Sequence, residues 1–131
     1  MALLIIKKPR TVSRALFSRI HKKVLGEKYA LGIIFVSPKK MQTLNSKYRK
    51  KNKPTDILSF ALNKKSGELY LSLSQVKAHA AMFGMKLHEY LPYLVIHGML
   101  HLKGLTHGRT MDRLETRYCR ALRIPHPQNL R

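Results

Sequence analysis

The chain has 131 residues, 44% of them apolar, which is enough for one domain that buries about two-thirds of the surface exposed by its unfolded form. Its 26 lysines and arginines oppose only 6 aspartates and glutamates, and this formal net charge of +20 predicts a polyanionic partner, which we expect to be nucleic acid. Because no apolar run could span a bilayer and the opening residues lack the polarity of a secretory signal, we expect no membrane partner, and the single cysteine excludes an internal disulfide.

The first part of the chain predicts two strands and two helices. Residues 2–7 and 31–36 are short apolar runs with β-branched side chains, which are typical of strands, and we expect the first of them to be buried. Residues 11–25 carry apolar side chains at helical spacing. Ser37 followed by proline is typical of a helix start. The apolar face of that second helix contains Met41, Leu44 and Tyr48.

The middle of the chain begins with a basic run, residues 47–53, whose charge alone is typical of a solvated turn. Residues 56–62 and 68–74 then read as strands, the second because leucines alternate with polar side chains. Ser66-Gly67 predicts a turn between them, so the two strands form either a hairpin or neighbours in one sheet. Ser74 is a candidate N-cap for a helix that ends at Gly84.

The last third predicts two more helices. The first is apolar, and we expect it to begin near Glu89 or Leu91, because Pro92 is tolerated in a first turn. Thr110 is a candidate N-cap for the final helix. Its inward side chains are expected to be Met111, Leu114, Tyr118 and Leu122, with Cys119 as a small buried hydrophobe. The order of elements predicts one α+β domain over residues 1–124, a small mixed sheet of about four strands packed with about five helices, and a frayed tail over residues 125–131.

Three histidines in the apolar helix and the loop after it predict a metal site. His97 and His101 lie four residues apart and therefore leave the same face of the helix one turn apart. Gly104 can take the left-handed conformation that reverses the chain, which would bring His107 back over His97 and His101. Three nitrogen donors with an open fourth position are typical of a catalytic zinc site. A structural zinc would need a fourth protein ligand, for which His126 is the only loose candidate.

The spacing of these histidines is that of the metzincin proteases, but the residue after the first histidine differs. Those enzymes carry a glutamate there as general base, whereas this chain has Gly98. The spacing thus favours a metal, and the glycine argues against a protease unless another carboxylate replaces the glutamate. None of four acidic residues has a spacing that ties it to the metal-binding helix: Glu68, Glu89, Asp112 and Glu115.

Two separate stretches resemble one family. Residues 44–49 with 54–60, LNSKYR and PTDILSF, resemble that family's L-N-x-x-Y-R and P-T-D-V-L-S-F segments. Residues 97–107, HGMLHLKGLTH, resemble its H-G-x-L-H-L-x-G-x-D-H motif, and residues 67–72 its G-D/E-I-x-I-S strand. The family is YbeY, described as a bacterial and organellar rRNA maturation factor and metal-dependent endoribonuclease. One position departs from the pattern, because Thr106 replaces the aspartate before the last histidine.

The resemblance implies a function and a set of site residues. His97, His101 and His107 would bind one Zn²⁺ per chain, and Arg49 would face the metal and stabilise the phosphate while activated water or a ribose 2′-OH attacks the phosphodiester. The basic run would bind RNA phosphates, and its candidate RNA contacts are Lys47, Tyr48, Lys50, Lys51 and Lys53. Tyr93 is a further candidate stacking platform, while Asn45, Thr55 and Asp56 are expected to order the loop.

The resemblance also implies partners and a compartment. We expect RNA as substrate, specifically rRNA and the small ribosomal subunit, with no small-molecule cofactor, in the cytoplasm or in an organellar matrix if the source is eukaryotic. The alternative from a different class is a non-catalytic RNA-binding ribosome-assembly factor that retains zinc for stability; a metalloprotease is a third reading.

Overall fold

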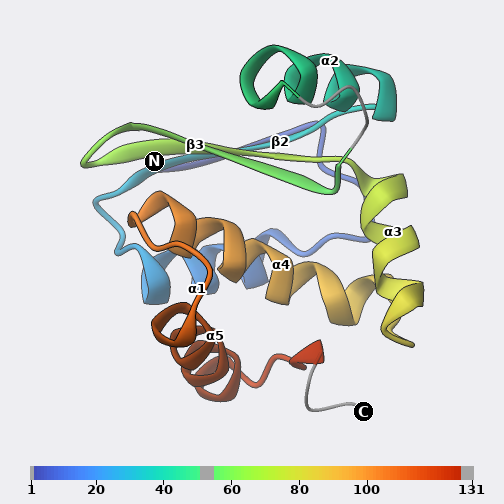
Figure 1. Ribbon diagram of the computed structural model, residues 1–131. Helices are drawn as coiled ribbons and strands as arrows, with labels where there is room; N and C mark the ends of the chain where they lie inside the picture. The colour runs from blue at the N-terminus through green and yellow to red at the C-terminus, as the bar shows by residue number, and fades with distance from the viewer. Residues whose placement is uncertain (1, 51–54, 128–131) are drawn as a thin grey trace.

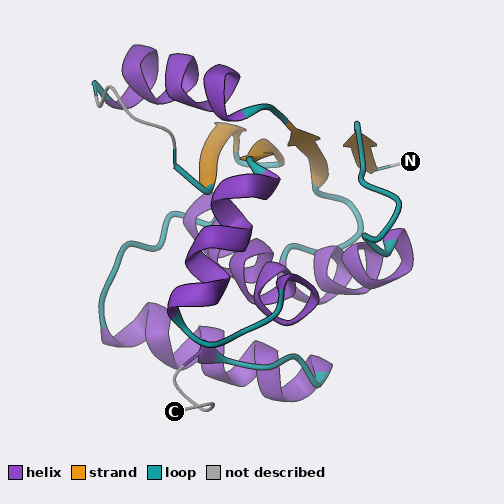
Figure 2. Cartoon of the chain, turned by 90° about the vertical axis from the view of Figure 1, so that its right-hand side faces the viewer, coloured by secondary structure: helices purple, strands orange, loops and turns teal. Residues whose placement is uncertain are grey.

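The computed structural model describes residues 2–50 and 55–127. Its elements follow the predicted order of strands and helices. They are β1 (Leu3–Ile6), α1 (Arg14–Val24), β2 (Ala30–Phe35), α2 (Pro38–Arg49), β3 (Ile57–Asn63), β4 (Ser66–Leu71), α3 (Leu73–Met82), α4 (Leu87–Leu102) and α5 (Arg109–Leu122). Figures 1 and 2 show the sheet with α2 on one face and α1, α4 and α5 on the other. The prediction of one α+β domain with a four-stranded mixed sheet is confirmed.

The sheet has the strand order β1-β2-β4-β3, in which β1, β2 and β4 are parallel and β3 is antiparallel to β4. The last two strands form the hairpin that the sequence left open. Its turn lies at Lys64-Lys65 and not at Ser66-Gly67, because the Asn63 side chain accepts a hydrogen bond from the Lys65 amide (2.8 Å) and closes the reversal earlier. The hairpin places β3 at a free edge of the sheet, beside α4.

The prediction that the first strand is buried was wrong for one of its faces. Leu3 is buried, but Leu4 and Ile6 are 59% and 40% exposed. The reason is that β1 is the other edge strand, and the only helix described on that outer face, α2, lies away from it (Figure 2). An apolar run therefore identified a strand but could not say whether both of its faces are covered.

Two helices begin earlier than predicted. Helix α3 has Ser72 as its N-cap residue instead of Ser74, so the strand before it ends at Leu71. Helix α5 has Gly108 as its N-cap residue, and the predicted cap, Thr110, lies inside the helix. In both places the helix begins two residues before the predicted start, which is within the usual uncertainty of a helix boundary.

Helix α4 also begins earlier, at Leu87, which puts Pro92 beyond the first turn where the sequence placed it. Lys86 and Glu89 stabilise this start, since the Lys86 amide donates to the Glu89 carboxylate (2.8 Å). A proline at this depth leaves the carbonyl of His88 without its helical partner. The His88 residue is itself exposed.

Helix α4 is the centre of the fold. It contacts α1, α3, α5, β3 and β4, and most of its side chains are buried, which explains why its sequence is apolar all round. Within the described ranges, no helix is both long and apolar enough to cross a membrane. The burial of Cys119 (2% exposed) confirms its prediction as a small hydrophobe, and this burial raises the pKa of its thiol to about 12.

The chain after α5 remains packed through His126, although the sequence assigned residues 125–131 to a frayed tail. His126 is 5% exposed, and its ring lies edge-on against Tyr93 with 5.1 Å between ring centroids. Residues 128–131 lie outside the described ranges.

One close approach fixes how α4 meets the sheet, at Gly98. A Cβ atom there would lie 2.6 Å from Ile57 Cδ1 and 2.9 Å from Leu69 Cδ2. We expect Gly98→Ala to lower the free energy of unfolding by about 1–3 kcal/mol, because the packed Ile57 and Leu69 side chains must shift or the helix must move away from the sheet. Urea denaturation measures this loss. The control is Gly32→Ala, whose Cβ would meet no heavy atom closer than 3.5 Å; equal stability of the two variants would contradict the close approach.

Candidate metal centre

The three predicted histidines converge. His97 and His101 project from adjacent turns of α4, and His107 returns from the following loop after Gly104, which takes a positive φ of 93°. One ring nitrogen from each histidine lies within 4.8 Å of the other two. The rings meet edge to face or tilted, with centroids 4.7 to 5.4 Å apart. The expectation of a candidate metal site on the central helix and the loop after it is confirmed.

Hydrogen bonds on the Nδ1 atoms decide which nitrogens face the centre. His97 Nδ1 lies 2.5 Å from a carboxylate oxygen of Glu115, and His101 Nδ1 lies 2.9 Å from the carbonyl oxygen of Leu105. Because a carbonyl oxygen only accepts, Nδ1 of His101 carries the proton, and the carboxylate favours the same tautomer for His97. Both Nε2 atoms then present lone pairs toward one point.

The donor set fits a cation at that point. The two Nε2 atoms are 3.2 Å apart. Two nitrogens bound to a tetrahedral zinc at about 2.0–2.1 Å would be separated by about 3.3 Å. Burial lowers the pKa of His101; the hydrogen bond to the Leu105 carbonyl opposes this shift, and the neighbouring histidines and Arg49 add to it, so the net direction is downward. The neutral imidazole, which is the form that binds a metal, is therefore favoured at His101.

The sequence missed one functional residue, Glu115. It comes from α5 and accepts hydrogen bonds from His97 Nδ1 and from the Tyr93 hydroxyl (3.2 Å), with its side chain only 5% exposed. The sequence spacing tied no acidic residue to the metal-binding helix. In the structure, Glu115 contacts His97 because α5 packs against α4. The available signal was helical phase: Glu115 lies on the same face as Met111 and Cys119, which is the buried face of α5.

Glu115 is also the centre of a small buried cluster with Tyr93 and His126. His126 Nε2 lies 3.9 Å from Glu115 Oε1. Burial, followed by the nearby Glu115 charge, raises the pKa of Tyr93, so its hydroxyl keeps the proton that it donates. Tyr93 therefore orients the carboxylate, and its ring packs beside those of Tyr90, His97 and His126. Within the described residues, the candidate metal-binding group does not include His126 as a fourth ligand.

Arg49 lies at the end of α2 and reaches the same cleft as the histidines. Its guanidinium donates to the Ser59 carbonyl (3.2 Å) on β3, and the Ser59 hydroxyl donates to the Gly98 carbonyl (3.1 Å) on α4. These contacts connect the arginine to the helix that carries His97. The cleft has a volume of about 790 Å³. Its lining is Asn45, Arg49, Thr55, Asp56, Ile57, Leu58, Ser59, Ala61, His97, His101, Gly104, Leu105, Thr106 and His107.

The geometry explains the glycine after the first histidine. A side chain at position 98 would point at Ile57, Leu69 and Ser59 of the sheet. A glutamate there would collide with the sheet before it could reach water in the cleft. The protease reading therefore has no base at this position.

The remaining candidate residues differ in how they are placed. Lys47, Tyr48 and Lys50 are exposed around the end of α2, and the Tyr48 ring packs on Phe60 with 5.2 Å between centroids. Lys51 and Lys53, also predicted to contact RNA, lie outside the described residues.

The residues expected to order the loop are placed around the same cleft. The buried Asp56 accepts a hydrogen bond from His79 of α3 (2.7 Å), and its carbonyl accepts from the Ser72 amide, so it fixes the start of β3 as expected. Asn45 is buried on α2. Thr106, which replaces an aspartate in the resemblance, is exposed at the cleft. The carboxylate that holds His97 comes from Glu115 instead.

Comparisons with known proteins show what this chain is similar to. The model of the family "Endoribonuclease YbeY" matches residues 6–121. A relative with the same description from Ehrlichia canis is 30% identical over 115 residues, covering 82% of this chain and 75% of its own length. A second, from Aster yellows witches'-broom phytoplasma, is 40% identical over 90 residues, covering 62% of each chain, so this alignment spans less than two-thirds of that relative. The solution structure of a Thermotoga maritima protein shares the fold, with a TM-score of 0.64, 24% identity, and coverage of 92% of this chain and 88% of its own.

Proposed function

The chain belongs to the YbeY family of endoribonucleases, and from this membership we propose that it is a zinc-dependent, single-strand-specific endoribonuclease that acts in rRNA maturation, ribosome assembly and quality control. The observation that carries the proposal is the shared cleft. It brings three histidine nitrogens and one arginine together in a chain with a formal net charge of +20. A metal site and a phosphate-binding group in one cleft are what phosphodiester cleavage requires.

His97, His101 and His107 would hold one zinc ion per chain, with Glu115 and the Leu105 carbonyl fixing the orientation of the first two rings. When bound, the ion supplies Lewis acidity toward water and the phosphate. Arg49 would hold two phosphate oxygens with its planar fork, because the contact to Ser59 uses one of its five N–H groups. The guanidinium then neutralises charge that builds on the phosphate as the bond breaks.

The attacking oxygen is either water or the ribose 2′-OH, and the products distinguish them. Attack by the 2′-OH leaves a 2′,3′-cyclic phosphate, whereas attack by water leaves a linear phosphate monoester. The partners that we propose are rRNA and the small ribosomal subunit, in the cytoplasm or an organellar matrix. Family membership supports these partners, and the uncompensated positive charge supports RNA in general.

We expect Arg49→Ala to reduce kcat/KM for single-stranded RNA by about 10²–10³-fold, the usual cost of losing one preorganised charge-stabilising group. Arg49→Lys should recover only part of the loss, because a lysine ammonium cannot form the two parallel hydrogen bonds that a guanidinium makes to two phosphate oxygens. Steady-state cleavage of a labelled oligonucleotide measures both effects. Since the Arg49 side chain is exposed, the Tm of both variants should stay near that of the wild type.

The same variant tests the non-catalytic alternative. If Arg49→Ala and His101→Ala both restored rRNA processing in cells lacking the endogenous protein, catalysis would not be the function, and an RNA-binding assembly role would replace it. The catalytic proposal requires that both variants fail while remaining folded.

A further inference from the structure

The exposed face of α5 carries four arginines that the proposed mechanism does not use. They are Arg109, Arg113, Arg117 and Arg120, and we refer to them as the α5 arginine stripe. At 100° per residue these positions fall within an arc of about 80°, opposite the buried face of the helix. The stripe extends for about 16 Å along the helix axis at 1.5 Å per residue. All four residues are exposed.

The stripe begins at the metal centre. His107 lines the cleft, Gly108 is the N-cap residue, and Arg109 is the first residue of α5. Figure 1 shows α5 on the side of α4 that faces away from the sheet, whereas the basic end of α2 lies on the far side of the sheet. The two basic surfaces therefore flank α4 and the cleft from opposite sides.

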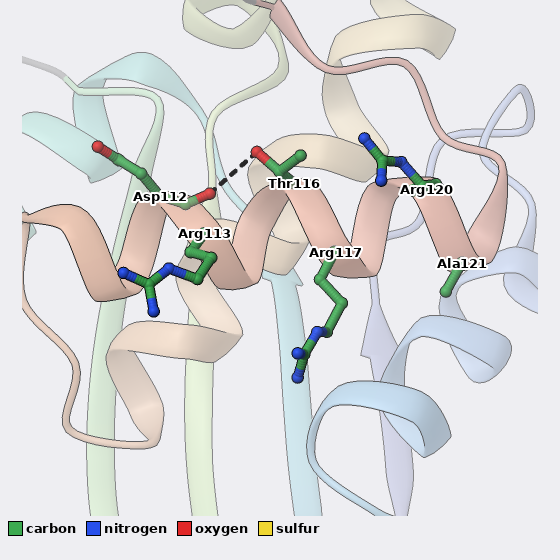
Figure 3. A pocket seen from close by; sticks show the side chains of 6 residues that line it. All are labelled: Asp112, Arg113, Thr116, Arg117, Arg120 and Ala121. Atoms are coloured by element: carbon green, nitrogen blue, oxygen red, sulfur yellow. Dashed lines mark hydrogen bonds between the residues drawn. The ribbon is translucent and has the colours of Figure 1, made fainter.

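The positive charge of the stripe is not compensated. Within residues 2–50 and 55–127, every recorded ion pair involves a histidine, so no lysine or arginine there lies within 4 Å of a carboxylate. Three of the arginines line one surface depression with Asp112, Thr116 and Ala121, and Asp112 is its single acidic side chain. In Figure 3, Arg113 and Arg117 extend from one side of the helix, and Arg120 extends from the other side, beyond Thr116. The Thr116 hydroxyl donates to the Asp112 carbonyl (3.0 Å).

The composition of this face favours nucleic acid over a protein partner. No large exposed hydrophobic residue lies on α5; the five in the described part of the chain are Leu4, Ile6, Tyr48, Leu62 and Met82. Protein interfaces have an apolar core with aromatic anchors, which this face lacks. Arginine forks without an apolar core are typical of phosphate-backbone contacts, which position a strand without reading its sequence.

We infer that the α5 arginine stripe binds the phosphate backbone of the RNA on one side of the cleaved bond. The inference rests on the proposed function, because it takes the strand in the cleft to be RNA. A strand cut internally must leave the cleft in two directions, and the stripe provides a path for one of them. Longer RNAs should thus bind more tightly than those that fill only the cleft.

The test compares two variants that each lose three positive charges. Arg113→Gln/Arg117→Gln/Arg120→Gln removes most of the stripe, and the control Lys28→Gln/Lys40→Gln/Lys77→Gln removes exposed lysines elsewhere. Fluorescence anisotropy with metal-loaded protein measures binding of single-stranded 2′-O-methyl RNAs of about 4 and about 16 nucleotides, a range of typical single-strand site sizes. Gels confirm that the RNAs stay intact.

We expect the stripe variant to bind the longer RNA at least about tenfold more weakly, with the slope of log affinity against log salt reduced by about 2, since each lost phosphate contact on a single strand contributes about 0.7. Binding of the shorter RNA should change less, and the control variant should differ from wild type by less than about threefold. In cleavage of the longer RNA, KM should rise while kcat is retained.

The outcomes separate this inference from the proposed function. If wild-type protein cleaves RNA but the stripe and control variants weaken binding equally, the stripe is not an RNA path. A second outcome is that polyglutamate binds the wild type as tightly as RNA does, and that the stripe variant loses the binding of both polymers. The stripe would then bind acidic proteins, and the RNA assignment would be overturned. If no form of the protein cleaves RNA, the proposed function fails, while a selective loss of long-RNA binding would still support the stripe.

Discussion

Replacing His101 by alanine is expected to reduce the bound metal from about one ion per chain to near zero and to abolish RNA cleavage. His101 supplies one of the three nitrogen donors found among the described residues, and its Nε2 lies 3.2 Å from that of His97. Removing one preorganised electrostatic group costs about 10²–10³-fold in kcat, and losing the ion with it should cost more. Metal analysis and cleavage assays measure the two effects separately.

The same variant has a stability readout that does not depend on activity. A ligand that binds only the folded protein stabilises it by about 2.7 kcal/mol at a concentration of 100 Kd, which for a domain of this size raises Tm by roughly 10 °C. Zinc should produce this rise in the wild type and not in His101→Ala. The matched control is His88→Ala, an exposed histidine on the same helix. An equal response of wild type and His101→Ala to zinc would mean that the metal binds elsewhere.

Replacing Glu115 is expected to weaken metal binding although the residue is not a ligand. Its carboxylate accepts from His97 Nδ1 at 2.5 Å and from the Tyr93 hydroxyl at 3.2 Å. Loss of a carboxylate that orients a ligating histidine usually costs about 10–100-fold in metal affinity. We expect Glu115→Gln near the low end of this range, because the amide oxygen can still accept, and Glu115→Ala near the high end. Competition with a chromophoric chelator gives both affinities.

Glu115→Ala should also lower the free energy of unfolding of the metal-free protein, by about 1–3 kcal/mol for each buried donor left unpaired. Glu115→Gln separates the two roles, because it preserves the shape of the side chain and an acceptor. Glu68→Gln, on a half-buried glutamate of the sheet, is the control for loss of one negative charge. Metal affinity in Glu115→Gln and Glu115→Ala equal to that of wild type would show that the carboxylate packs beside the site without supporting it.

The parts of the site that lie close in sequence could be predicted from it. His97 and His101 share a helix face because four residues make about one turn, and Gly104 permits the reversal that returns His107. The order of strands and helices followed from apolar periodicity in the same way. Each of these features depends on backbone geometry over a few residues, which the sequence specifies directly.

The features that were missed depend on contacts between distant segments. Glu115 is 18 residues from His97, and only the packing of α5 on α4 brings them together. The exposure of Leu4 depends on where α2 lies, and Pro92 lies beyond the first turn because α4 begins at Leu87. No local pattern contains this information. A buried acidic residue on an apolar helix face was the one usable sign, because an unpaired charge is costly to bury.

The most direct test is X-ray absorption spectroscopy of the zinc-loaded protein. We predict three imidazole nitrogens at about 2.0–2.1 Å together with one oxygen from solvent, and loss of this signature in His107→Ala. A shell of four protein ligands, or an unchanged spectrum in that variant, would contradict a catalytic metal held by His97, His101 and His107.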